Sequence, residues 1–416
     1  MRDMSLEVRT IGDSDFPGWL RAAKIGFHRP PSVTEEEIAL RRPQTDLDRT
    51  QGAFDEGRCV ATFRSMPREL TVPGGAVLPA SAITNVTVTA THRRRGLASR
   101  MMAAELDASV RRGEPVAILV AAEYRIYGRF GFGPAAGVTE WEVDTARAGR
   151  PQGAPSGSGR VDVADPSEVL KLGPQLHDRV RLRHPGAINR TERNWEYATG
   201  TVINPSFPWK EPTFVLYRDA SGRVDGLAAY TAEDTWHGMF PKVPLTVREL
   251  IAATPEAERA LWRYLLAMDW VATVRTGFRG QDDVLPLLLD DPRAAHVHST
   301  SDFLWLRLLD VPRALAARTY AAPGTVVLDV TDPDGYAAGR FRLEAAVDGT
   351  ATAGAAPSAA PDISLTAAAL ASLYLGDESA ARLTVTGGVT ESRPGGAARV
   401  DALFRTARKP WPIDTF

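Results

Sequence analysis

The chain has 416 residues, 44% hydrophobic and 24% charged, which is typical of a globular protein too long for one ordinary core. Its 49 basic and 51 acidic residues give a net charge of −2, which argues against a nucleic-acid partner. A single cysteine, Cys59, excludes an internal disulfide framework and a cysteine-based zinc site. We expect a cytoplasmic protein without a membrane partner, because no apolar run could span a bilayer and no signal-peptide core follows Met1.

A strand–helix–strand unit is predicted in the first region, residues 1–148. Residues 80–89 are rich in β-branched side chains, which favours a strand. Residues 96–112 have the periodicity of a helix. The apolar residues that recur at every fourth position are Met102, Leu106 and Val110. Residues 115–120 form a continuous apolar run, as expected for a strand buried on both faces.

Earlier in this region, Ser32 and Glu35 resemble a capping box that opens a helix. Two strands are predicted at 59–65 and 66–73, and the Pro-Gly-Gly sequence at 73–75 predicts a turn.

A second region, residues 149–305, begins with a linker-like sequence at 149–159. It repeats the strand–helix–strand plan, with a strand at 243–252, a helix from about 255 to 268 and a strand at 271–274.

The loop at 253–258 reads Ala-Thr-Pro-Glu-Ala-Glu, and its two glutamates repel a phosphate. If the two regions are structural duplicates, only the first can bind an anion.

The third region, residues 306–416, is predicted to mix strands and helices around a loop at 349–361 that is rich in Ala, Gly, Pro and Ser. The strands are predicted at 326–330 and 340–343, and the helices near 365–375 and 398–408.

The first region carries an anion-site pattern where the strand at 80–89 runs through three arginines and Gly96 into the predicted helix. A helix N-terminus has unpaired N–H donors and a positive dipole end, so it is suited to a phosphate or pyrophosphate. The alternative interpretation is a solvated basic face beside a core strand.

The sequence Arg93-x-x-Gly96-x-Ala98 resembles the acetyl-CoA element of the GNAT superfamily of acetyltransferases. This resemblance implies that the loop amides hold the pyrophosphate and that the preceding strand bonds the pantetheine arm. The residues implied in acetyl-CoA binding are Val86, Thr87, Val88, Arg94, Arg95, Gly96, Leu97, Ala98, Ser99, Ala122 and Glu123.

A second GNAT-like element is the run Tyr127-Gly-Arg-Phe-Gly-Phe-Gly-Pro134. In GNAT enzymes a tyrosine here can lie beside the thioester sulfur and protonate the departing thiolate, a role that the resemblance implies for Tyr127. Tyr124, one helical turn earlier, is the other candidate. The alternative interpretation is that Tyr127 is one more core aromatic.

Taken together, these elements resemble the Eis-like branch of the GNAT N-acetyltransferases. The resemblance implies an α/β (α+β) fold with a catalytic GNAT domain at 1–148 and a GNAT-like domain without a CoA site at 149–305. A sterol-carrier-protein-like domain would follow at 306–416. It also implies a homo-oligomer, a hexamer in this family, and a C-terminal carboxylate, here of Phe416, that acts as general base.

The resemblance predicts an enzyme that transfers acetyl from acetyl-CoA, without a metal, to primary amines of small polycationic molecules such as aminoglycosides. Two features depart from some relatives: residues 23–28 contain no acid, and Thr415 precedes Phe416. Asp414 is the nearest acid that could compensate. The alternatives are a protein-lysine or polyamine acetyltransferase, and a non-catalytic lipid or acyl carrier.

Overall fold

The computed structural model describes residues 6–149, 159–206 and 209–416. The chain divides into two compact units. Unit 1 holds the chain up to Ala135, Leu304–Ala407 and Thr415–Phe416; unit 2 holds Ala136–Phe303 and Arg408–Asp414. Each unit is therefore assembled from segments that are far apart in the sequence.

The N-terminal part of unit 1 is a mixed sheet in the order β1-β2-β3-β4-β5-β15. All neighbours are antiparallel except β4 and β5, which run parallel on either side of α3 in the chain. The strands are β1 (Leu6–Thr10), β2 (Thr50–Asp55), β3 (Arg58–Thr71), β4 (Val77–Val88), β5 (Val116–Val120) and β15 (Ala295–Leu308), of which Leu304–Leu308 belongs to this unit.

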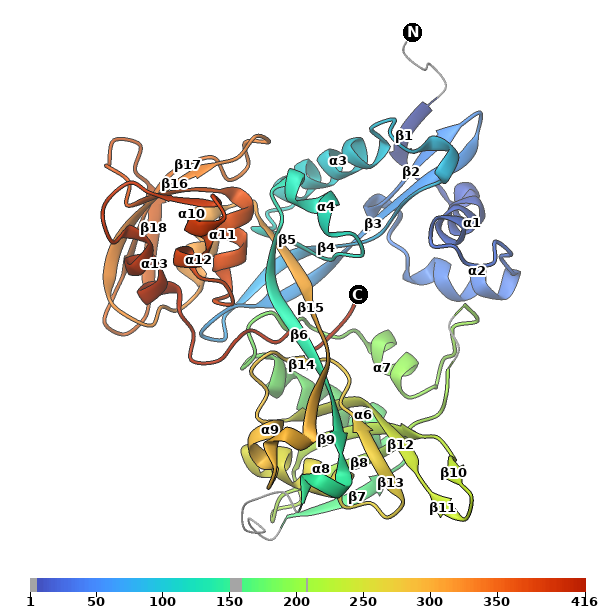
Figure 1. Cartoon of the computed structure of the whole chain (residues 1–416). Coiled ribbons are helices and arrows are strands. Elements are labelled where there is room, and N and C mark those ends of the chain that lie inside the picture. The colour runs from blue at the N-terminus through green and yellow to red at the C-terminus, as the bar shows by residue number, and fades with distance from the viewer. Residues whose placement is uncertain (1–5, 150–158, 207–208) are drawn as a thin grey trace. The chain divides into compact units, whose positions relative to one another are not determined.

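Two helices cover opposite faces of this sheet, because neighbouring side chains of a strand alternate between faces. Cys59 packs in the cluster of α1, whereas Val60 packs in the cluster of α3. Figure 1 shows α1 and α3 on different sides of β3. The helices are α1 (Phe16–Gly26), α2 (Glu35–Arg41), α3 (Leu97–Arg111) and α4 (Tyr124–Tyr127).

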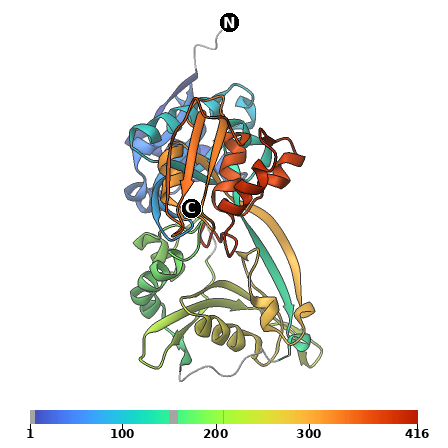
Figure 2. The ribbon, with the colours of Figure 1, turned by 90° about the vertical axis from the view of Figure 1, so that its left-hand side faces the viewer.

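The C-terminal part of unit 1 is a five-stranded sheet in the order β18-β17-β16-β19-β20. Figure 2 shows its strands in orange and the last helices in red beside them. Its elements are α10 (Val311–Ala317), β16 (Gly324–Thr331), β17 (Gly339–Ala345), β18 (Ala351–Ala355), β19 (Ile363–Thr366), α11 (Ala367–Tyr374), α12 (Ala380–Val385), β20 (Val389–Glu391) and α13 (Gly396–Phe404).

Unit 2 is built on a sheet in the order β15-β6-β13-β12-β9-β8-β7, with β14 paired to β6 and a separate β10–β11 hairpin. Its strands are β6 (Gly133–Asp144), which begins in unit 1, β7 (Arg160–Ala164), β8 (Thr213–Arg218), β9 (Val224–Ala232), β10 (Trp236–His237), β11 (Phe240–Pro241), β12 (Val243–Ala252), β13 (Val271–Arg275) and β14 (Arg279–Gly280). Its helices are α5 (Thr145–Ala148), α6 (Pro166–Arg181), α7 (Glu192–Ala198), α8 (Pro255–Leu266) and α9 (Leu285–Leu288).

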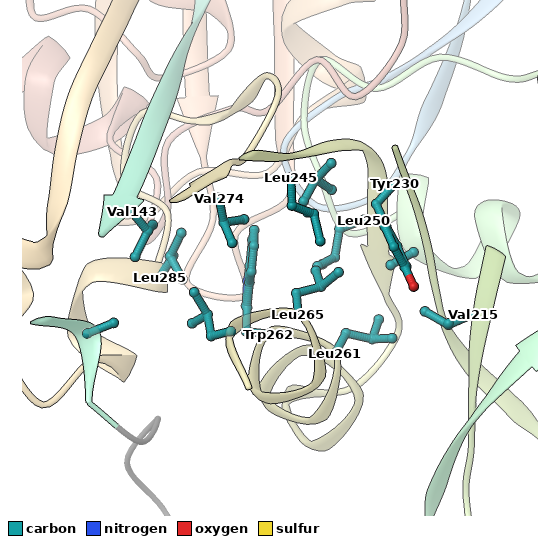
Figure 3. Packing of buried hydrophobic residues seen from close by; sticks show 14 of the residues in the cluster. Val143, Val215, Tyr230, Leu245, Leu250, Leu261, Trp262, Leu265, Val274 and Leu285 are labelled. Carbon is teal, nitrogen blue, oxygen red and sulfur yellow. The ribbon is translucent and has the colours of Figure 1, made fainter. Parts of the chain in front are cut away.

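The core of unit 2 is organised around α8. Trp262 is fully buried there, and Figure 3 shows it in one cluster with Val274, Leu285 and Leu265. The predicted strand–helix–strand repeat at 243–274 is confirmed as β12, α8 and β13, with β12 and β13 parallel.

Three expectations from the sequence are wrong in detail: the Ser32 cap, the division of residues 59–73 into two strands, and the loop at 349–361. The helix predicted after Ser32 is capped by Thr34, whose hydroxyl accepts from the Glu37 amide. The helix predicted at 96–112 is confirmed as α3. Of its four-residue repeat, Met102 and Leu106 are buried and Val110 is 47% exposed, because such a repeat drifts by about 40° per step from the 3.6-residue period.

The strands predicted separately at 59–65 and 66–73 are one strand, β3, because β4 pairs along almost its full length. Part of the loop predicted at 349–361 is the strand β18, which pairs with β17 through main-chain groups that need no particular side chain. Most of the predicted linker at 149–159 lies outside the described residues.

Candidate active site

The site begins where β4 and β5 part. Their parallel ladder ends at the pair Ile83 and Leu119, although β4 continues to Val88. Asn85 has a left-handed φ of 53°, and the register with β3 shifts beside it, between Thr62 and Arg64. This bulge bends the end of β4 and opens a space beside its main chain.

The helix that follows begins without a side-chain cap. Arg94 and Gly96 have left-handed φ values of 65° and 74°, and Gly96 is the N-cap residue of α3. The first intrahelical bond runs from the Arg100 amide to the Gly96 carbonyl. The amides of the first turn therefore precede the hydrogen-bond ladder and are suited to an anion.

A cavity of about 1090 Å³ joins these two features. Of the residues predicted to bind acetyl-CoA, it is lined by Val86, Thr87, Val88, Arg94, Gly96, Leu97, Ala98, Ser99 and Glu123. Tyr127 lines it as well. Three predicted site residues, Arg95, Ala122 and Phe416, are not among the lining residues.

The cavity also has walls that the sequence did not indicate. Arg129 lies within the quoted Tyr127–Pro134 run, so the motif could have suggested it. Ile25 lies in the last turn of α1 and His28 lies just after that helix, and no local signal points to them. Packing brings them there: a Cβ on Gly26 would lie 2.3 Å from the Thr87 Cβ, so only glycine allows this approach of α1 to β4.

The charge around the cavity is predominantly positive. Arg93, Arg94 and Arg129 line it, against one carboxylate, Glu123, which lies 3.8 Å from the Arg93 guanidinium. His92 is buried at the turn before α3, and its Nε2 lies 3.0 Å from Oδ2 of Asp55. This arrangement favours an anionic ligand at the start of α3.

Tyr127 and Tyr124 differ in their surroundings. Tyr127 is 8% exposed, lines the cavity and packs against Phe132 and Trp305 with ring centroids 6.4 Å away. Burial, and secondarily the Glu123 carboxylate, raises the pKa of Tyr127 above its usual value. Tyr124 is 62% exposed and is not a lining residue. Of these two tyrosines, Tyr127 is the one that lines the cavity, and its raised pKa keeps its hydroxyl protonated at neutral pH.

The end of the chain reaches β4 at the point of divergence. The Thr84 hydroxyl donates to a main-chain oxygen of Phe416 at 3.3 Å. Thr84 directly follows Ile83, the last β4 residue paired with β5. Thr84 and Phe416 both belong to unit 1.

The corresponding helix start in unit 2 differs in its chemistry. The Thr254 hydroxyl accepts from the Ala257 amide, and Pro255 occupies the first turn of α8. Glu256 and Glu258 add negative charge in that turn. The start of α3 has free amides and arginines nearby, whereas the start of α8 has a capped amide and two glutamates. The start of α8 therefore disfavours a phosphate.

Two further observations concern metals and membranes. Within residues 6–149, 159–206 and 209–416, no group of three or more His, Cys, Asp and Glu side chains could hold a metal ion. No helix in the described part of the chain is long and apolar enough to cross a bilayer.

Comparison with known proteins gives the family. Two acetyltransferase (GNAT) domain models match residues 7–135 and 186–308, and a sterol carrier protein domain model matches 311–412. The chain is 35% identical to the N-acetyltransferase Eis of Mycobacterium tuberculosis over 96% of this chain and 97% of that protein. The chain belongs to the Eis-like family of GNAT N-acetyltransferases.

Two further proteins are similar to this chain over their full length. An uncharacterized N-acetyltransferase of Streptomyces griseus is 52% identical over 99% of this chain and 100% of the relative. The crystal structure of Eis1 from Mycobacterium abscessus matches with a TM-score of 0.84 and 31% identity, over 99% of this chain and 100% of that chain. As an Eis-like N-acetyltransferase, the protein has two GNAT domains followed by a sterol-carrier-protein-like domain, and its family uses acetyl-CoA.

Proposed function

We propose that this Eis-like enzyme acetylates primary amines of small molecules in the cavity between the β4 end and the α3 start. Acetyl-CoA would lie with its pyrophosphate on the loop from Arg94 to Ser99 and its pantetheine arm along Val86–Val88. The open helix start, the positive charge and the divergence of β4 from β5 support this placement.

The observation that carries the proposed mechanism is the bond from Thr84 to Phe416. It supports a carboxylate at the point where the parallel strands part, which is where the thioester would lie if the pantetheine follows β4. An uncharged amine attacks the thioester carbon, and the carbon–sulfur bond breaks. The proton lost by the amine nitrogen goes to the Phe416 carboxylate.

The departing thiolate takes its proton from the Tyr127 hydroxyl, so the products are the N-acetyl amine and CoA thiol. Protonation by solvent then restores the tyrosine, and the carboxyl loses its proton to solvent. An α-carboxyl is an intrinsically weak base, with a reference pKa of about 3.3–3.7. It suffices here because the nitrogen of the addition intermediate is cationic and far more acidic than a free ammonium ion.

The acceptor that we test first is a polycationic amine such as an aminoglycoside, as the family resemblance implies. Two carboxylates that could recognise it, those of Asp414 and Glu37, already have partners within the protein. Both oxygens of Asp414 are already bound, to His177 and Arg190. Glu37 of α2 is paired with Lys24 of α1 and with Arg41. These pairs favour a smaller amine, so polyamines and lysine peptides belong in the same panel.

The experiment measures thiol release from acetyl-CoA with an aminoglycoside, a polyamine, a lysine peptide and a simple monoamine. We expect turnover by the full chain and a loss of about 100-fold or more when Phe416 is deleted. Extending the chain by one glycine should have the same effect, because it displaces the carboxylate. Full activity in both variants would remove the C-terminal base from the mechanism.

We further propose the domain limits 1–148, 149–305 and 306–416, with acetyl-CoA bound only by the first domain. The acidic, capped start of α8 supports this restriction. A homo-hexamer is proposed on the family resemblance alone, and light scattering coupled to gel filtration tests it.

A further inference from the structure

The segment before the chain terminus is docked on unit 2 along its length. Arg408 Nε donates to Asp282 Oδ2 at 2.8 Å, and the Lys409 amide donates to the same oxygen at 3.0 Å. The Trp411 amide donates to the Pro185 carbonyl at 2.9 Å, and the Arg279 guanidinium lies 4.3 Å from the Trp411 ring centre. The ends of most chains are poorly ordered, so a terminal segment with this many contacts indicates that its position matters.

The strongest anchor is Asp414, whose side chain is 8% exposed. One carboxylate oxygen accepts from Nε2 of His177 at 2.8 Å, and the other accepts from Nε of Arg190 at 2.6 Å. The His177 side chain is 1% exposed. Arg190 stacks on Trp195 at 4.7 Å. A buried carboxylate is thus held by two donors that are themselves fixed by packing.

Arg190 does not depend on Asp414 alone. Its Nη1 lies 2.7 Å from Oε1 of Glu249, so Arg190 has a second ion pair that does not involve the tail. Burying a carboxylate is costly unless donors satisfy it, and here both are provided two residues before the end of the chain. Apolar packing alone would be enough to shield a chain end from solvent. A buried carboxylate with two fixed donors does more, because it holds the backbone at Asp414 in one place.

We propose that Asp414 is a positioning residue for the terminal carboxylate, an inference that rests on the catalytic role proposed for Phe416. Two residues span at most about 7 Å, so a docked Asp414 confines the terminus to that radius. Without docking, the nine residues after Ala407 could reach about 30 Å. The single hydrogen bond from the Thr84 hydroxyl to the terminal carboxylate is too weak by itself to hold a terminus against that freedom.

Asp414→Asn tests the proposal with almost no change in volume. We expect kcat to fall at least 10-fold while KM for acetyl-CoA stays within about twofold, because the tail does not line the acetyl-CoA cavity. Carboxypeptidase should release Phe416 at least 10-fold faster than from the unaltered chain. Asp291→Asn, an exposed acid of unit 2 paired with Arg147, is the matched control and should change neither quantity.

His177 gives a second, independent pair of variants. His177→Gln keeps a donor toward Asp414 and should retain most of kcat, whereas His177→Leu removes it and should behave like Asp414→Asn. If the contact between His177 and Asp414 were only structural, both His177 variants would have a lower melting temperature, and their kcat values would not differ from each other. If a variant does not fold, amide hydrogen exchange over residues 408–416 of the unaltered protein decides: protection supports docking, and exchange at the rate of a free peptide overturns it.

The deletion of Phe416 separates this inference from the proposed function. If the deletion leaves kcat unchanged, the carboxylate has no catalytic role and both proposals fall. If the deletion inactivates the enzyme while Asp414→Asn keeps full kcat and a protected tail, the catalytic proposal stands and the positioning role is wrong.

Discussion

Tyr127 and Tyr124 lie one helical turn apart in α4, yet they differ in the two properties that an acid needs. Tyr127 lines the cavity and is 8% exposed, whereas Tyr124 is 62% exposed and edge-on to Trp305 at 4.9 Å. Sequence spacing cannot separate them, because both belong to the same short helix. The two tyrosines are distinguished by burial, because only the face of α4 that carries Tyr127 is buried.

Tyr127→Phe should lower kcat by about 100-fold, because it removes the hydroxyl proton and keeps the ring packing. KM for acetyl-CoA should change little. Steady-state thiol release measures both. Tyr124→Phe is the matched control, and an equal loss in that variant would contradict the assignment of Tyr127 as the acid.

At the scale of elements, the start of α3 depends on a left-handed Gly96. A Cβ at Gly96 would meet no heavy atom within 4 Å, so the backbone conformation and not space demands glycine. Gly113, after the end of α3, shares both properties, with a φ of 72° and open surroundings. The two glycines differ in that only Gly96 lines the cavity.

Gly96→Ala and Gly113→Ala should each cost about 1–2 kcal/mol of folding free energy, because alanine is strained at positive φ. Only Gly96→Ala should also weaken acetyl-CoA binding, by about 10-fold, since it shifts the first-turn amides. Urea unfolding and calorimetric titration measure the two effects. Equal acetyl-CoA affinities in both variants would contradict an anion site at this helix start.

A second element-scale feature is His184, whose ring is edge-on to Trp411 of the docked tail at 5.0 Å. Burial, aided by the nearby Arg279 and Arg408, lowers its pKa to about 4. Because the unfolded chain binds this proton near pH 6.5, the neutral ring contributes its full stability above that pH. The contribution is lost as the pH falls from 6.5 toward 4.

His184→Gln should therefore flatten the pH dependence of stability between pH 7 and 5. Between pH 7 and 5 the free energy of unfolding of the unaltered protein should fall by on the order of 2 kcal/mol more than that of the variant. Urea unfolding at fixed pH values measures the difference. Parallel pH profiles for the two proteins would show that the pKa of His184 is the same in the folded and unfolded chain.

At the scale of the whole molecule, unit 1 needs a strand that arrives late in the chain. Leu304–Leu308 pairs antiparallel with Val116–Val120, and β5 is nearly fully buried. Trp305 packs in the same cluster as α3. Arg307 forms a fully buried ion pair with Asp332 at 2.7 Å. A fragment that stops before residue 304 lacks all three contacts.

We expect a fragment of residues 1–148 to aggregate or to give a poorly dispersed NMR spectrum, because it exposes the apolar edge of β5. A version with residues 304–310 attached through a flexible Gly/Ser linker should be more soluble and better dispersed. A monomeric, well-dispersed 1–148 fragment would contradict this dependence.

The sequence by itself determined the repeating local features: the α3 and α8 helices, the strands that flank them, and the basic start of one against the acidic start of the other. These features depend on residues close in the chain, so periodicity and helix-end chemistry are sufficient to find them. The family could be named for the same reason, because its motifs are contiguous runs.

Only the tertiary structure decided which distant segments meet. It brings Ile25 of α1 and His28, two residues after that helix, to the cavity, and Phe416 to Thr84. It also buries Asp414 between His177 and Arg190, and it selects Tyr127 over Tyr124 as the lining residue. Each of these facts depends on packing between residues that no local pattern links, since burial belongs to the assembled fold and not to any one segment.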